Sequence, residues 1–361
     1  MLAGVVADVR DRLTGHAGRA NARLGFLKPP PARAGLVWIK SDAREVNGRL
    51  AAEIARGVRA RCADTPLIVT FEQEHPAVLS RLKTIANLGY AYGPADRSRA
   101  ARRILERFKP AHIVALGEGL RPRLAALMRV AGVACCIVHG WPAAGAGGCV
   151  GFAHTASERQ AWQGHVHWDA PFCALLAAAQ VEPIFQGIAG AHARALFWVT
   201  DAPPGVNTRL AQAWRASDHG ARDLLFLATW VPGAQRLSAW DGDRRALAPG
   251  SVIWVDEERF WPALAASCTA IHLTAPAEPL LWAALAGGRA TSASDVAGLD
   301  LPGAPPLARI AADDLMAYWA GLLAQPDRAR AAADGLRRYF WQQRRCAADA
   351  AESLVARLCG H

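Results

Sequence analysis

The sequence has no uninterrupted apolar run of about 20 residues, the length that a helix needs to cross a bilayer. The apolar stretch at its start is short and is interrupted by Arg10, which does not fit a signal peptide. We therefore expect any membrane contact to be peripheral and to involve the basic amphipathic segment 1–34. The alternative is that this segment forms a terminal helix that packs on the protein itself.

The eight cysteines lack the spacing of a metal or redox site. Cys135 and Cys136 are neighbours in an apolar run, where successive side chains of a strand point to opposite faces. They fit small core residues in a reducing compartment. The segment HVHWD at 165–169 contains metal-ligating residue types, but no other His or Cys has a matching spacing. We expect no metal site and no cofactor.

Lysine is scarce, because only four of the 41 Lys and Arg residues are lysines, while the formal net charge is +10. Two explanations of the arginine excess stay open, namely GC-rich coding and recognition of phosphate groups. A basic surface favours anionic partners such as lipid phosphates, a nucleotide or an acidic membrane. The tryptophans are mostly scattered singly, which does not fit a row of base-stacking platforms. We expect no nucleic-acid partner.

Short apolar runs alternate with amphipathic helical patterns along most of the chain, which is typical of parallel sheets with helices on both faces. No dinucleotide-binding glycine motif and no P-loop follows a first strand, which disfavours oxidoreductases and P-loop NTPases. The predicted strands are 36–40, 66–71, 112–117, 134–139, 195–200, 224–229, 251–256, 270–275 and 289–294.

The length of 361 residues suits two domains rather than one core. The alternation pauses in a linker-like stretch that ends near residue 190 and then resumes. We predict an α/β protein with two Rossmann-like domains in tandem. The boundaries that we expect are 1–34 for the basic segment, 35–188 for the first domain, and 189–361 for the second domain with a C-terminal helix.

One candidate site follows the first predicted strand, in the segment LVWIKSDAREV at 36–46. Its loop places Glu45 at the start of an amphipathic helix, outside the carboxyl end of a strand, where open α/β sheets bind ligands. A carboxylate there is suited to take a proton from a hydroxyl group. Asp42 is a second candidate base. The alternative is that Glu45 only stabilises the helix N-terminus, which is worth about 0.3–1 kcal/mol.

A second candidate segment, YAYGPADRSRAARRILERFKPAHIVALGEGLRPRL at 90–124, predicts a turn, an Arg-rich helix and a strand that ends in a Gly-Glu-Gly loop. Glu118 lies in this loop, and Arg121 and Arg123 follow it as candidate ligands of an anion. A solvated strand-to-helix turn is the alternative. His139 ends the next predicted strand, where a histidine has either a binding or a structural role.

This order of elements resembles the N-terminal half of the bacterial Kdo transferases, which add 3-deoxy-manno-octulosonic acid to lipid A precursors. KSDAREV is similar to the family pattern H-A-V-S-V-G-E-V and keeps its Glu-Val step. LGEGLRPRL is similar to E-T-E-L-W-P-N-L at Leu120 and Pro122. The resemblance implies that Glu45 is the catalytic base. The acceptor-binding residues that it implies are Asp42, Glu118, Arg121 and His139.

The resemblance continues, more weakly, over residues 195–295. The segment AIHLTAPAEPLLWAALAGGRATSASD is similar to the family's donor-binding segment. This chain does not keep the Gly-Gly-Ser loop of the family, and Leu281 replaces a glutamate of the family pattern. In such enzymes a nucleotide phosphate binds at helix N-termini, where free N–H groups attract it. The donor-binding residues that the resemblance implies are Thr200, Asn207, Thr274, Glu278 and Ser292.

The resemblance implies the GT-B architecture, in which two Rossmann-like domains face each other across a cleft. The first domain is then expected to bind an anionic lipid or saccharide acceptor, and the second a nucleotide-sugar donor, CMP-Kdo. The implied function is transfer of Kdo to a lipid A precursor or related envelope saccharide, in the cytoplasm at the periphery of the inner membrane. Two alternatives stay open. One is a non-catalytic paralogue that binds an envelope saccharide or a partner transferase, and the other is a GT-B transferase that uses another nucleotide sugar.

Overall fold

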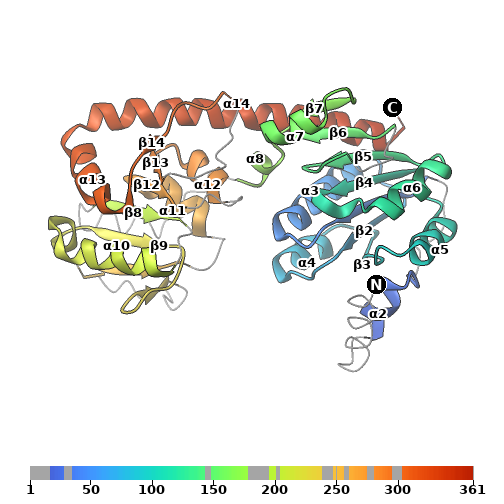
Figure 1. Cartoon of the computed structure of the whole chain (residues 1–361), viewed down its shortest axis with the longest axis horizontal. Coiled ribbons are helices and arrows are strands. Elements are labelled where there is room, and N and C mark those ends of the chain that lie inside the picture. Colours follow the sequence, from blue (N-terminus) through green and yellow to red (C-terminus); the bar gives the residue numbers. More distant parts are fainter. Residues whose placement is uncertain are drawn as a thin grey trace. The chain divides into compact units, whose positions relative to one another are not determined.

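The computed structural model describes residues 17–27, 35–142, 148–177, 195–200, 204–237, 247–248, 250–255, 260–274, 280–294 and 303–360. Packing divides the chain into two units. Unit 1 comprises Met1–Phe172 and Cys346–His361, and unit 2 comprises Cys173–Arg345. Each unit contains one sheet of seven parallel strands (Figure 1). The predicted α/β fold with two Rossmann-like domains is therefore confirmed.

The sheet of unit 1 has the strand order β3-β2-β1-β4-β5-β6-β7. The chain therefore adds β2 and β3 on one side of β1, and then adds β4 to β7 on the other side. The elements of this unit are α2 (Ala17–Arg23), β1 (Val37–Ser41), α3 (Glu45–Arg61), β2 (Leu67–Phe71), α4 (Pro76–Lys83), β3 (Leu88–Tyr92), α5 (Ser98–Phe108), β4 (His112–Leu116), the 3-10 turn η1 (Gly117–Gly119), α6 (Pro122–Val130), β5 (Ala134–Val138), β6 (Val150–Ala153), α7 (Ala156–Ala161) and β7 (His167–Asp169).

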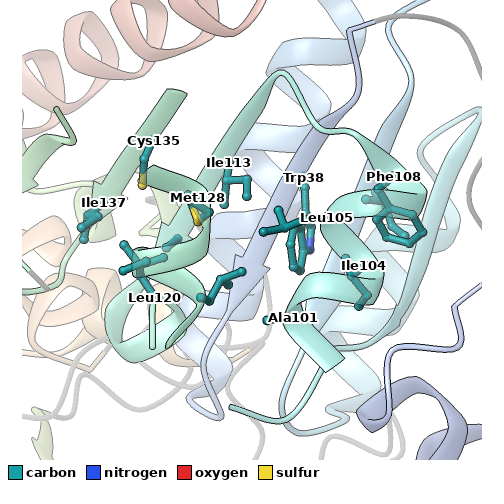
Figure 2. Close-up of a cluster of buried hydrophobic side chains, with 14 of the residues drawn as sticks. Trp38, Ala101, Ile104, Leu105, Phe108, Ile113, Leu120, Met128, Cys135 and Ile137 are labelled. Carbon is teal, nitrogen blue, oxygen red and sulfur yellow. The ribbon is translucent and has the colours of Figure 1, made fainter. Parts of the chain in front are cut away.

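One face of this sheet packs against α5 and α6. Trp38, Ile113 and Cys135 point from their strands into a cluster with Ile104 of α5 and Met128 of α6 (Figure 2). Because successive strand residues alternate between faces, the neighbouring strand residues point to the opposite side, where α3 packs on β1 and β2. The strands that are buried on both faces explain the continuous apolar runs in the sequence.

Unit 2 repeats this plan with the strand order β10-β11-β9-β8-β12-β13-β14. Its elements are α8 (Cys173–Leu176), β8 (Leu196–Val199), α10 (Pro204–Ala216), the 3-10 turn η2 (Asp218–Ala221), β9 (Leu224–Leu227), β10 (Gln235–Arg236), β11 (Val252–Trp254), α11 (Trp261–Ser267), β12 (Ala270–Leu273), α12 (Leu280–Gly287), β13 (Ala290–Ala293), β14 (Ala308–Arg309), the 3-10 turn η5 (Ala312–Asp314), α13 (Leu315–Ala324) and α14 (Pro326–Leu358), whose last residues belong to unit 1.

Aromatic side chains dominate the core of unit 2. Phe197 of β8 stacks on Trp319 of α13 at a centroid distance of 4.5 Å, and it contacts Trp214 of α10 edge-on at 5.7 Å. All three are fully buried. Such contacts contribute about 0.5–1.5 kcal/mol beyond the area that they bury. Together they hold α10 and α13 on one face of the sheet.

The sequence pattern predicts the central strands of both sheets and misses several outer strands. Residues 90–92, expected in a turn, form the end of β3 instead, and β6, β7, β10 and β14 were not predicted. The physical reason is burial. The side chains of β3 are only partly buried, so its sequence lacks the apolar run that marks a central strand. Among the described residues, no helix combines the length and apolar character that crossing a membrane requires.

Candidate functional site

Each sheet has one point at which its strand order reverses. In unit 1 this point lies between β1 and β4, and in unit 2 it lies between β8 and β12. The loops that leave neighbouring strands at such a point run to opposite faces and leave a crevice at the carboxyl edge, where open α/β sheets bind ligands. We call these the unit 1 switch and the unit 2 switch.

Asp42 lies at the unit 1 switch and contacts both of its loops. It is buried, and its carboxylate accepts hydrogen bonds from the backbone N–H of Arg44 (3.0 Å), Nε of Arg44 (3.0 Å), Nδ2 of Asn47 (2.9 Å) and the backbone N–H of Glu118 (3.2 Å). The last of these bonds joins the loop after β1 to η1 after β4. Because four donors surround its oxygens, Asp42 acts here as a tie between the two loops.

Two glycines allow this close approach. Gly117 has a φ of +58°, and a Cβ atom at this position would lie 2.2 Å from Oδ2 of Asp42. A Cβ atom at Gly119 would lie 2.5 Å from the carbonyl oxygen of Lys40. Any side chain would therefore displace the carboxylate or the strand. The Gly-Glu-Gly sequence is the local reason that Glu118 can donate its N–H to Asp42.

A chain of ion pairs lies beside Asp42. Lys40 Nζ donates to Glu72 Oε1 at 3.1 Å, Arg121 Nη2 donates to Glu72 Oε2 at 3.1 Å, and Arg121 Nη1 donates to Glu118 Oε2 at 3.0 Å. Burial lowers the pKa of the Lys40 ammonium, although Glu72 opposes this shift. The hydrogen bond to Glu72 raises the pKa of the Arg121 guanidinium. Glu72 is thus the central anion of the switch.

Lys40 and Glu72 are site residues that were not predicted from the sequence. Two signals were present, since a lysine stands inside the apolar run of β1 and Glu72 directly follows β2. Lysine is almost never fully buried without a partner, so a lysine in a central strand predicts a buried anion nearby. What the sequence does not show is which acidic residue, 32 positions away, supplies it.

Glu45 lies at the rim of the unit 1 switch. It is the first residue of α3, and its side chain is 31 % exposed. Its Oε1 pairs with Nη2 of Arg49 at 2.9 Å, and its Oε2 lies 3.6 Å from Nδ1 of His75. Its position in the first turn of the helix also favours a negative charge. Glu45 therefore has both solvent access and a fixed orientation, whereas the buried Asp42 has only the fixed orientation.

His139 follows β5 and is buried. It has a φ of +52°, the left-handed region that non-glycine residues rarely occupy. Its Nε2 lies 3.2 Å from the backbone N–H of Phe172 and 3.2 Å from the carbonyl oxygen of Ala170. Accepting from Phe172 requires the ring proton to be on Nδ1. The ring thus contacts backbone groups of its own unit.

The unit 2 switch is built from hydroxyl groups and one histidine. Oγ1 of Thr274, just after β12, donates to the carbonyl oxygen of Thr200, just after β8, at 3.0 Å. His272 lies between two serines, with Nδ1 3.0 Å from Oγ of Ser292 and Nε2 3.0 Å from Oγ of Ser294. Burial lowers the pKa of the His272 imidazole to about 4. The ring is therefore neutral at pH 7, with one nitrogen donating and the other accepting.

Two predicted donor residues remain. Asn207 belongs to the first turns of α10, directly after β8, and is fully buried. Glu278 lies outside the described residues. The structure therefore brings together Thr200, Thr274 and Ser292 in unit 2, and Asp42, Glu118 and Arg121 in unit 1. His272 and Ser294 complete the unit 2 set, and a histidine inside the apolar run of β12 was an available signal for the first of them.

Comparisons with known proteins find similarity in structure only. No protein-family model matches the sequence, and no curated protein matches it. Among solved structures, UDP-GlcNAc 2-epimerase from Neisseria meningitidis bound to UDP-GlcNAc is 11 % identical, with a TM-score of 0.59 over 90 % of this chain and 100 % of that one.

Two further structures show the same fold. HepE from Anabaena in complex with UDP is 10 % identical, with a TM-score of 0.59 over 89 % of this chain and 99 % of that one. The glycosyltransferase SnogD from Streptomyces nogalater is 15 % identical, with a TM-score of 0.52 over 90 % of this chain and 99 % of that one. The chain therefore shares the fold of these proteins, with two α/β units that each contain a parallel sheet.

Proposed function

We propose that this protein is a glycosyltransferase that transfers a sugar from a nucleotide-sugar donor to an anionic acceptor. The observation that carries the proposal is that both Rossmann-like units place polar side chains at the point where the strand order reverses. The fold supports it, because similar structures include a glycosyltransferase and proteins bound to UDP or UDP-GlcNAc.

The unit 1 switch is proposed to bind the acceptor. Glu45 takes the proton of the acceptor hydroxyl as its oxygen attacks the anomeric carbon, while the bond from that carbon to the donor phosphate breaks. Attack from the face opposite the leaving phosphate inverts the anomeric centre. Arg121, whose side chain is 38 % exposed, is available to an acceptor phosphate or carboxylate.

The unit 2 switch is proposed to bind the donor. Thr274 and Ser294 are partly exposed hydroxyl residues at the carboxyl edge, and Thr200 and Ser292 support them from the strand ends. Asn207 and Glu278 complete the proposed donor set. On the resemblance of LVWIKSDAREV and LGEGLRPRL to the Kdo transferases, the donor is CMP-Kdo and the acceptor a lipid A precursor at the cytoplasmic face of the inner membrane.

The first test is calorimetric titration of the whole chain with CMP, UMP, UDP and GDP. Selective binding of CMP would support the Kdo assignment. Selective binding of UDP, the nucleotide bound by HepE, would favour a transferase that uses a UDP-sugar. Absence of binding to all four would overturn the proposed donor site.

The second test is substitution of the proposed base. Glu45→Gln is expected to lower kcat by about 10²–10⁴-fold, because the amide cannot accept the proton. Glu53→Gln is a matched control, since Glu53 also lies on α3, is 30 % exposed and pairs with an arginine. Unchanged turnover of Glu45→Gln would show that another group is the base.

A second candidate function is binding of a saccharide without transfer. The observation that favours it is that Asp42, Glu72 and Glu118 already have cationic or N–H donors. Incubation of the purified chain with radiolabelled nucleotide sugar and envelope acceptors distinguishes the two functions. Transfer of label excludes this alternative, whereas acceptor binding without transfer supports it.

A further inference from the structure

Two cysteines of unit 1 lie side by side at the beginning of neighbouring strands. The parallel register of β5 and β6 pairs Cys136 with Val150 and Ile137 with Gly151. One step earlier in this register, Cys135 lies opposite Cys149. Both contact the same hydrophobic cluster beneath α6, so their side chains lie on the same face of the sheet.

A cavity of about 260 Å³ opens onto this pair. Cys135 is 6 % exposed, whereas Cys149 is more exposed. Figure 2 shows Cys135 among the side chains of Leu120 and Met128, which also line the cavity. The cavity is large enough to admit several water-sized molecules, so a small oxidant can reach the Cys149 thiol.

The two thiols differ in acidity. A hydrogen bond with Cys135 lowers the pKa of the Cys149 thiol, although burial acts in the opposite direction. The same hydrogen bond and burial raise the pKa of the Cys135 thiol well above its usual value. Because the thiolate is the nucleophile, the more exposed Cys149 is the attacking group and the buried Cys135 is the proton-bearing partner.

We propose that Cys149 and Cys135 form a peroxide-reactive dithiol, separate from the two switches. The Cys149 thiolate attacks one oxygen of a hydroperoxide, the O–O bond breaks, and Cys149 becomes a sulfenic acid while hydroxide or alkoxide leaves. The Cys135 sulfur then attacks the Cys149 sulfur, the S–O bond breaks, and one water leaves. The two cysteines are oxidised by two electrons, and the peroxide is reduced by the same number.

The backbone geometry permits the resulting disulfide. Neighbouring strands are about 4.7–4.9 Å apart, and the Cα atoms of a disulfide lie about 4.4–6.8 Å apart. Cys149 precedes the first residue of β6, so its backbone can adjust without breaking the pairing of β5 with β6. A thiol reductant reverses the bond by exchange. The link would join β5 and β6 near the cavity.

The test uses the whole reduced chain and hydrogen peroxide, followed by alkylation and peptide mass mapping. The expected result is a disulfide between Cys135 and Cys149, seen as a loss of two hydrogen atoms from the peptide that contains both cysteines, which a dithiol reductant reverses. In Cys135→Ser, dimedone is expected to label Cys149 as the sulfenic acid. In Cys149→Ser, Cys135 is expected to stay unmodified.

Three other cysteines serve as controls in the same peptide map. Cys346 is exposed and lies outside the pair, so Cys346→Ser should leave the disulfide unchanged. The thiol of Cys359 contacts that of Cys62, so a bond between these two would be read separately. Alanine variants at 135 and 149 replace any serine variant that fails to fold. The proposal is overturned if Cys149 stays reduced while Cys346 is oxidised, or if dimedone labels Cys135 in Cys149→Ser or Cys149→Ala.

Discussion

The two switches share a topology and differ in chemistry. In unit 1, buried Lys40 and buried Asp42 are held by opposite charges and N–H donors. In unit 2, the described side chains are hydroxyls and a neutral histidine. The same Rossmann-like plan therefore tolerates either a charged or a neutral network at the same place, because the backbone sets the crevice and the side chains set its electrostatics. The two networks should respond differently to charge removal, to steric change and to pH.

The largest effect is expected from removing the anion that holds Lys40. Glu72→Leu leaves the ammonium buried without its hydrogen-bonded carboxylate, and it should lower the free energy of unfolding by about 4 kcal/mol. The double variant Lys40→Met/Glu72→Leu should recover most of this loss, because neither charge is then left alone. Urea denaturation of both variants checks this prediction. Equal stability of the single and double variants would mean that the pair is not an energetic unit.

The next effect tests the steric fit of the unit 1 switch. Gly117→Ala places a Cβ atom against the Asp42 carboxylate and keeps a positive φ, so it should cost about 3 kcal/mol. Gly132→Ala is the matched control, since Gly132 has a φ of +66° and no neighbouring atom within 4 Å of the added Cβ. It should cost only about 1–2 kcal/mol. Thermal unfolding measures both, and similar losses would show that the contact with Asp42 is not tight.

The third effect should be confined to the unit 2 switch and appears as a pH dependence. The pKa of His272 is about 4 in the folded chain, below the ordinary value of 6.5, so the unfolded chain binds more protons between these values. Stability therefore falls as the pH drops through this window, by about 2 kcal/mol between pH 7 and pH 5.

His272→Asn should remove this part of the pH dependence, whereas His165→Asn, at an exposed histidine, should keep it. Hydrogen exchange of the β12 peptide at pH 7 and pH 5 is the measurement. An unchanged pH response in His272→Asn would assign the dependence to other groups.

The smallest effect belongs to the exposed end of the ionic chain. Glu118 pairs with Arg121, but its side chain is 69 % exposed. Glu118→Gln should therefore change the free energy of unfolding by less than about 1 kcal/mol, and this change should shrink in high salt. Urea denaturation at low and high salt measures it. A loss as large as that of Glu72→Leu would contradict the view that Glu72 is the central anion.

The central strands were predictable because they are buried on both faces and therefore appear as apolar runs. β3 was not, since Tyr90 is exposed and its neighbours are only partly buried, so the segment carries no such run. β6 was missed because only four residues, Val150–Ala153, form it after a stretch rich in glycine and alanine. Outer strands contribute less to the core, and the sequence pattern weakens accordingly.

The sequence pattern could predict which loops carry the residues of the candidate site. Glu45, Glu118 and Thr200 follow strands in the sequence, and the carboxyl ends of parallel strands share one edge, so their general location followed from the pattern. The pairing of Lys40 with Glu72 was not predictable, because it joins β1 to the residue after β2, and only the sheet order reveals that these strands are adjacent.

By itself, the sequence determined two α/β units, because alternating apolar runs and amphipathic segments leave few other ways to bury the strands. It also determined the places of the loops that carry polar residues. Only the tertiary structure decided which of these residues are buried, which are paired, and which stay open to a ligand. Hydrogen bonds and ion pairs depend on distances of about 3 Å between residues far apart in the chain, and such distances exist only once the strands are packed.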